Sequence, residues 1–155
     1  MIPLTDPPKT LAEGQPLPRT EPGARPLILV VDEHADSREF VKFFLERRGY
    51  RIVEAEDGES AIADAAKKRP DMVLLDVWLP KVDGLEAVKQ MHELPDLHDL
   101  PVLFISGHAG FNYRDQAMAA GGVDYLIKPI DLDQLLRLIE RYVSKNHGDT
   151  VATRC

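Results

Sequence analysis

Short, unbroken apolar runs constrain what this chain can fold into more than any other feature of its sequence. The clearest are residues 27–31, 72–75 and 102–105, each bounded by polar or turn-forming residues. Runs of this length are typical of strands that are buried on both faces, as in a parallel sheet. Weaker runs predict two further strands at 51–55 and 125–127.

Stretches with helical spacing of apolar residues lie between these runs. The apolar residues that share one face of the first are Phe40, Val41, Phe44 and Leu45. Asp36 or Ser37 can cap this helix, and Asp131 can cap the last one, which we expect to end at Gly148. The same spacing predicts further helices around 61–69, 85–91 and 112–120. Because strands and helices alternate strictly, we predict an α/β fold with a five-stranded parallel sheet and helices on both faces.

The length of the chain, 155 residues, suits one domain with a full core. Seven of the twelve prolines lie in residues 1–26, where the few apolar residues show no period. We therefore expect a disordered or extended tail at 1–26 that acts as a spacer, one globular domain at 27–146, and a flexible tail at 147–155.

The composition excludes several classes of protein. A net charge of −7 disfavours a direct nucleic-acid partner and is compatible with an acidic pocket that holds a cation. The one cysteine, Cys155, excludes an internal disulfide and a zinc cluster of thiolates. The sequence has neither an apolar run of about 18 residues, which a membrane span needs, nor an N-terminal signal pattern. We therefore expect a cytoplasmic protein without membrane contact.

Four of the predicted strands turn polar at their carboxyl ends. Asp32 and Glu33 follow the first strand, Asp76 the third, Ser106 the fourth and Lys128 the fifth. In a parallel sheet these ends lie along one edge, which is where ligands bind in open α/β sheets. Each residue alone has a plainer explanation, as a turn residue, a helix cap or a surface charge. Together they bring three acids, a hydroxyl and an amine to one crevice.

This combination of side chains points to phosphate chemistry. Acids that are packed together need a cation, and oxygen ligands suit Mg²⁺, which takes few carboxylates and keeps several waters. A carboxylate such as Asp76 can attack a phosphoryl group and form an aspartyl phosphate. Lys128 and the Ser106 hydroxyl can then hold the phosphoryl oxygens. The set therefore suits an acceptor of phosphate better than a hydrolase.

The motifs of other enzyme classes are missing from the sequence. No Gly-x-Gly-x-x-Gly or Walker loop follows the first strand, and neither HExxH nor Gly-x-Ser-x-Gly occurs. A phosphatase of the haloacid dehalogenase type needs a second Asp at the position that Trp78 occupies. We therefore do not expect a conventional enzyme.

Residues 27–146 resemble the receiver domain of bacterial two-component response regulators. The matching segments, each at a strand end and in this order, are 28–33 (ILVVDE) with Arg38, 74–76 (LLD) with Leu79-Pro80 and Asp83-Gly84, 104–107 (FISG), and 124–129 (DYLIKP). The resemblance implies a flavodoxin-like, doubly wound sheet with strand order 2-1-3-4-5.

The resemblance also implies roles for the polar residues. Asp76 would be the phosphoryl acceptor, and Asp32 and Glu33 would hold Mg²⁺ together with Asp76 and the backbone carbonyl of Trp78. Lys128 would bind the phosphoryl group.

Two further residues would form the switch that the resemblance implies. Ser106 would supply the switch hydroxyl, and Tyr125 would be the aromatic residue whose rotamer reports the state of Ser106. The peptide bond between Lys128 and Pro129 would be cis. Trp78 is bulky and could shield the phosphoryl group from water, whereas Gly107, where alanine is common, could open access to it. The lifetime of the phosphorylated state is therefore left open.

The function implied is a Mg²⁺-dependent switch that accepts phosphate on Asp76 from a histidine kinase or a histidine phosphotransfer protein and then binds a downstream protein target. A homodimer is left open. Two alternatives stand beside this interpretation of a stand-alone receiver. The chain could be a non-phosphorylated scaffold for protein contacts, or a receiver fragment of a larger hybrid signalling protein in which residues 1–26 are a linker.

Overall fold

The computed structural model describes residues 25–107 and 111–154, so nearly all of the proline-rich segment, and Cys155, lie outside the described residues. The strands are β1 (Leu27–Val31), β2 (Arg51–Ala55), β3 (Met72–Leu75), β4 (Val102–Ser106) and β5 (Asp124–Ile127). The helices are α1 (Ala35–Glu46), α2 (Gly58–Lys68), α3 (Gly84–His92), α4 (Phe111–Ala120) and α5 (Leu132–Arg154).

The five strands form one parallel sheet in the order β2-β1-β3-β4-β5, as predicted. Val31 at the end of β1 pairs with Ala55 of β2 and with Leu75 of β3. At the other side of the sheet, Ser106 of β4 pairs with Ile127 of β5. This register brings the carboxyl ends of all the strands to the same edge, so the residues that follow them are neighbours.

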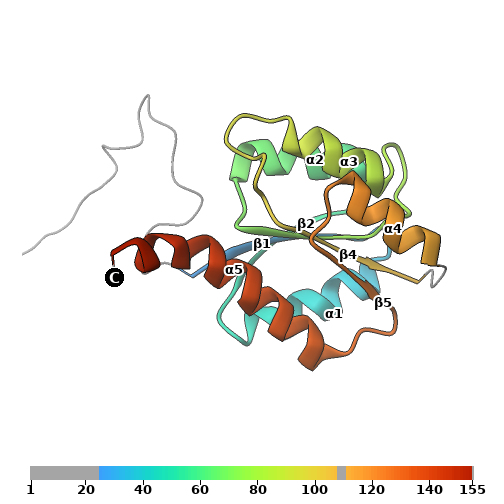
Figure 1. The fold of residues 1–155 in the computed structure, drawn as a ribbon. Coiled ribbons are helices and arrows are strands. Elements are labelled where there is room, and N and C mark those ends of the chain that lie inside the picture. Colours follow the sequence, from blue (N-terminus) through green and yellow to red (C-terminus); the bar gives the residue numbers. More distant parts are fainter. Residues whose placement is uncertain (1–24, 108–110, 155) are drawn as a thin grey trace, which may run out of the picture.

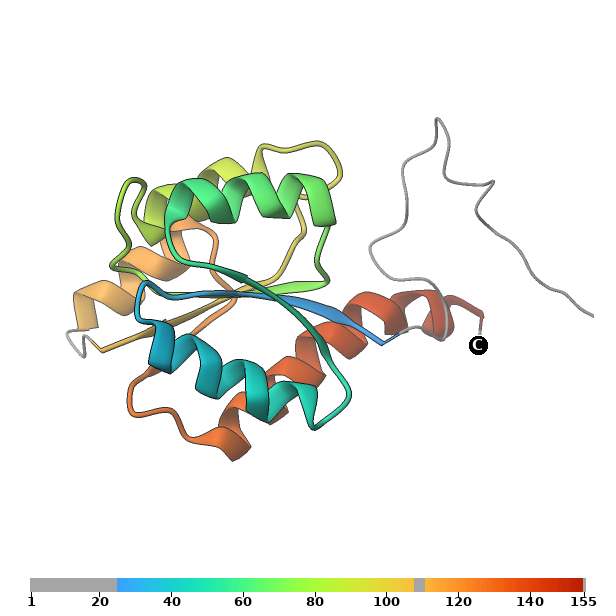
Figure 2. The same cartoon turned by 180° about the vertical axis from the view of Figure 1, so that it is seen from behind.

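The helices form two layers, one on each face of the sheet (Figures 1 and 2). Alternate residues of the strands belong to two different cores. Leu29, Val73 and Phe104 belong to a core with α2, α3 and α4, whose helices contribute mostly alanine, valine and methionine. The neighbouring strand residues, such as Ile28 and Leu74, belong to a second core with α1 and α5. Both layers are apolar because the sheet is covered on both sides, which explains why the strands are continuous apolar runs.

The ends of the first and last helices differ from the prediction. His34, rather than Asp36 or Ser37, is the N-cap of α1, and its side chain forms no capping hydrogen bond. Asp131 does cap α5, since its Oδ1 accepts a hydrogen bond of 3.1 Å from the backbone N–H of Gln134. The prediction that this helix ends at Gly148 is wrong, because α5 runs to Arg154. One glycine inside a helix costs only about 1 kcal/mol and need not end it.

In the part of the chain that the structure describes, no helix combines the length and apolar character that crossing a membrane requires.

Candidate functional site

The carboxyl ends of β1, β3 and β5 bring two acids and one amine into contact. The Lys128 ammonium Nζ lies 2.8 Å from Asp32 Oδ2 and 3.4 Å from Asp76 Oδ2. The side chains of both acids are almost buried, at 10% and 9% exposed, and that of Lys128 is 24% exposed. One ammonium group therefore pairs with two carboxylates that come from sequence positions far apart, and the trio keeps a net negative charge.

Asp32 is held in place through both its side chain and its backbone. Its Oδ1 accepts the backbone N–H of His34 at 2.9 Å, which is the hydrogen bond of an Asx turn. Its own backbone N–H donates to the Ala55 carbonyl at 3.2 Å, which extends the β1–β2 ladder by one residue. The carboxylate thus points toward Lys128 from a backbone that the sheet fixes.

Asp76 is held in the same way at the end of β3. Its Oδ1 accepts the backbone N–H of Trp78 at 3.0 Å, and its backbone N–H donates to Val31 at 3.1 Å. The loop that follows is packed tightly against it, because the N–H of Gly84 donates to Val77 at 2.8 Å. A Cβ atom at Gly84 would overlap the carbonyl oxygen of Asp76, so this position requires glycine.

The surroundings shift the pKa values of Asp76 and Lys128. Burial raises the pKa of Asp76, and the charge of Asp32 raises it further, while the Trp78 N–H and Lys128 oppose the rise. Burial alone would lower the pKa of Lys128, but its hydrogen bonds and charge interactions with Asp32 and Asp76 raise it overall. The amine therefore stays charged at neutral pH, whereas the site disfavours the charged form of Asp76.

Ser106 and Tyr125 lie beside this trio in a buried position. Ser106 is fully buried and Tyr125 is 4% exposed, and a hydrogen bond joins their side chains. Burial raises the pKa of the Tyr125 phenol, and this hydrogen bond opposes the rise. Arg114 of α4 donates to the Tyr125 carbonyl at 3.3 Å and to Asp124 at 3.2 Å, so α4 is tied to the same strand.

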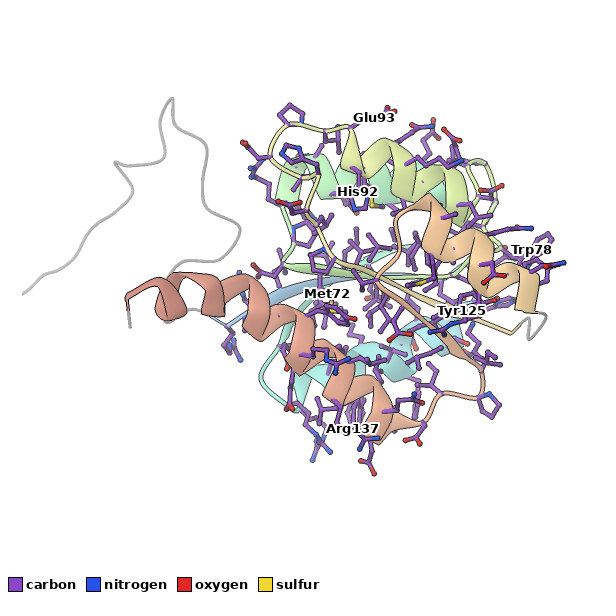
Figure 3. All side chains as sticks on the ribbon, viewed as in Figure 1. Met72, Trp78, His92, Glu93, Tyr125 and Arg137 are labelled. Carbon is purple, nitrogen blue, oxygen red and sulfur yellow. The ribbon has the colours of Figure 1, made fainter. Side chains whose placement is uncertain are left out.

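Trp78 connects the loop after β3 to α4. Its ring lies edge-to-face with that of Tyr113, with 5.9 Å between the centroids, and the side chain is half exposed. Figure 3 shows Trp78 at the edge of the molecule, beside α4. The residue that donates its N–H to Asp76 therefore also contacts the helix that Arg114 ties to β5.

Glu33 follows Asp32 directly and is exposed. Within residues 25–107 and 111–154, no three His, Cys, Asp or Glu side chains form a group that could hold a metal ion. Two buried carboxylates, those of Asp32 and Asp76, do contact the same Lys128 ammonium group. Mg²⁺ takes few carboxylates from a protein and completes its shell with water. The donors present therefore fit Mg²⁺ bound by two acids, and they do not suit a metal that needs a full set of protein ligands.

The comparison with known proteins agrees with this geometry. A sequence model of the response regulator receiver domain matches residues 28–140. The chain belongs to the receiver domain family. This receiver is 40% identical over 122 residues to the response regulator MprA of Mycolicibacterium vanbaalenii, a match that covers 79% of this chain and 52% of MprA. It therefore spans about half the length of the MprA relatives that it matches.

Two other matches extend over most of the similar chain. An uncharacterised 14.6 kDa protein of Leptolyngbya boryana is 34% identical over 115 residues, which cover 74% of this chain and 88% of that protein. Among solved structures, the receiver domain of the sensor histidine kinase PA1611 of Pseudomonas aeruginosa has a TM-score of 0.73 and 28% identity, over 78% of this chain and 99% of that one. That structure holds a magnesium ion coordinated in its active site cleft.

The cis peptide bond implied between Lys128 and Pro129 is present in this receiver. One contact of the site was not predicted from sequence: Arg38 donates through Nη1 to the carbonyl oxygen of Asp32 at 2.7 Å. The partner of Arg38 on the sheet is Glu54, whose Oε1 lies 3.0 Å from Arg38 Nε. An acid inside the otherwise largely apolar strand 51–55 is the signal that could have indicated this pair.

Proposed function

We propose that this receiver accepts a phosphoryl group on Asp76 and works as a phosphorylation-dependent switch. The contact that carries the proposal is the one between Lys128 and the two buried acids, Asp32 and Asp76. A structural ion pair needs one acid for one amine, whereas here a second buried carboxylate shares the amine. A second buried carboxylate is a liability for stability unless the site uses it.

In the proposed reaction a carboxylate oxygen of Asp76 attacks phosphorus. The new oxygen–phosphorus bond forms as the bond from phosphorus to the donor breaks, and the donor leaves with the electron pair of that bond. The donor is the phosphohistidine of a kinase or of a phosphotransfer protein. Lys128 would hold a phosphoryl oxygen, and the Ser106 hydroxyl would donate to another.

Mg²⁺ would be held by Asp32 and Asp76, with the Trp78 carbonyl as a further ligand, and would neutralise the charge that develops on the phosphoryl oxygens. Glu33 is proposed to act through bound water rather than directly, since its side chain is exposed. The chain's own contribution is to fix the acceptor: the Trp78 N–H orients one oxygen of Asp76 and Lys128 faces the other.

The ionisation of Asp76 gives the proposed reaction a pH dependence. Only the carboxylate is a nucleophile, and the pKa of Asp76 is raised, first by burial. Phosphoryl acceptance should therefore be lost as the pH falls through this raised value, at a higher pH than for an exposed aspartate.

The proposed switch is the hydrogen-bonded pair of Ser106 and Tyr125. When Ser106 turns to a phosphoryl oxygen, it gives up this bond, and Tyr125 and the attached α4 shift in population between two arrangements. The output would be a contact with a downstream protein through α4, β5 and α5. We propose residues 27–146 as the unit that performs this function and 1–26 as a spacer.

The proposal is tested by incubating the full chain with a small phosphodonor and Mg²⁺ and measuring the intact mass. One base-labile phosphoryl group should appear on the wild type and on Asp36→Asn, an exposed control on α1. It should be missing from Asp76→Asn and after chelation of the metal. A chain that stays unlabelled under all conditions would favour a scaffold that works without phosphate.

A further inference from the structure

A charged cluster on α1 and β2 lies next to the acidic site and is not explained by it. Glu54 of β2 accepts from Arg38 Nε at 3.0 Å through Oε1 and from Lys42 Nζ at 3.0 Å through Oε2. The Arg38 side chain is 15% exposed, whereas that of Lys42 is 38% exposed. The two cations therefore share one acid, but only Arg38 extends toward the interior.

The other end of Arg38 reaches the backbone of a site residue. Its Nη1 donates to the carbonyl oxygen of Asp32 at 2.7 Å. This carbonyl belongs to the peptide that leads from Asp32 into the turn before α1, so no strand can hold it. Glu54 on β2 holds the Arg38 guanidinium in place, and the guanidinium in turn holds the backbone of the turn that follows Asp32.

With this contact every polar group of Asp32 has a partner. The backbone N–H donates to Ala55, Oδ1 accepts from the His34 N–H, and Oδ2 contacts Lys128. Removing Arg38 would leave the Asp32 carbonyl, the backbone group of this residue that faces the turn, without the partner that holds it. The amine of a lysine could pair with Glu54, but it lacks the planar fork that binds two acceptors in fixed directions.

We propose that Arg38, held by Glu54, is a positioning residue for the divalent-cation site, and that its contact with the Asp32 carbonyl sets the affinity of the site for Mg²⁺. This inference rests on the proposed function. Groups that orient metal ligands without touching the metal commonly change metal affinity by about 10- to 100-fold when they are replaced.

The test is a titration of the full chain with Mg²⁺, followed by the NMR signal of the Trp78 indole N–H. Trp78 is the one tryptophan, so this signal is unambiguous, and its backbone contacts Asp76. We expect Arg38→Gln to raise the dissociation constant for Mg²⁺ about 10-fold or more. Lys42→Gln is the matched control, because it removes the other partner of Glu54 and leaves the Asp32 carbonyl paired; its affinity should stay within about 2-fold of wild type.

A second variant separates positioning from a merely structural role. Arg38→Lys keeps the charge beside Glu54, so it should recover most of the thermal stability that Arg38→Gln loses, but it should not recover the affinity for Mg²⁺. Arg38→Gln with the affinity of Lys42→Gln would overturn this inference alone. A wild type whose signal shows no saturable response to Mg²⁺ would overturn the magnesium-dependent function as well.

Discussion

Replacing Lys128 by methionine tests how the two buried acids are held. The substitution keeps an unbranched side chain of similar length and removes the charge that lies 2.8 Å from Asp32 and 3.4 Å from Asp76. Both carboxylates would then face each other in a nearly buried site without a cation. We expect the free energy of unfolding at neutral pH to fall in the absence of divalent cations.

The size of the loss follows from the burial of the three groups. An exposed ion pair contributes about 0.2–1 kcal/mol, whereas leaving a fully buried charge without its partner costs about 3–5 kcal/mol. The acids here are nearly buried and Lys128 is partly exposed. The expected loss lies between these limits, at about 2 kcal/mol, or about 6–10 °C in Tm for a domain of this size.

The assay is urea unfolding followed by circular dichroism, with a chelator and then with Mg²⁺. Because a divalent cation between the carboxylates can replace the missing amine, Mg²⁺ should stabilise Lys128→Met more than wild type and narrow the difference between them. Lys42→Met is the control, since it removes an ammonium that pairs with Glu54 outside the site. If Lys128→Met loses no more stability than Lys42→Met, or is not stabilised by Mg²⁺, Lys128 does not offset the charges of the two acids.

Three further predictions concern the acceptor and its loop. In the folded chain the pKa of Asp76 lies above its usual value of 3.8, so the folded chain keeps this proton at pH values at which the unfolded chain has released it. The contribution of Asp76 therefore makes the protein less stable as the pH rises from 3.8 through the folded pKa. Asp76→Asn should therefore unfold at a higher urea concentration than wild type at neutral pH, and the difference between the two midpoint concentrations should shrink in acid. Gly84→Ala should lower the free energy of unfolding by about 1–3 kcal/mol, measured by chemical denaturation, because the added Cβ overlaps the backbone of Asp76. Gly107→Ala is the control: a Cβ there meets open space, so the free energy of unfolding should change by less than about 0.5 kcal/mol. A double-mutant cycle that replaces Trp78 and Tyr113 by alanine should give a coupling energy of about 0.5–1.5 kcal/mol, and a value near zero would show that the ring contact does not join the loop to α4.

The strand order and both helix layers could be predicted because local pattern decides them. Short apolar runs bounded by turn-forming residues favour strands that are covered on two sides, and strict alternation with helices leaves few topologies. The same logic brought Asp32, Asp76 and Lys128 to one edge, since any polar residue that ends a parallel strand must lie there. The structure confirms that these three side chains meet.

The remaining features depend on contacts across the fold, which a local pattern does not contain. Glu33 stands beside Asp32 in sequence, but the turn directs it to solvent. Phe40 has the spacing of a core residue, yet it is 54% exposed, and the residues of α1 that are buried are Val41 and Leu45. The bond from Arg38 to the Asp32 carbonyl joins a side chain to a backbone group, and no sequence pattern reports such a contact.

The most direct test of the central claim identifies the residue that carries the phosphoryl group. The full chain is phosphorylated with a small donor and Mg²⁺, the acyl phosphate is reduced with borohydride to homoserine, and the peptides are sequenced by mass spectrometry. We predict conversion at Asp76 and none at Asp32, although both acids contact the same amine. Conversion to homoserine at Asp32 would contradict the account, and so would conversion at any other residue in Asp76→Asn.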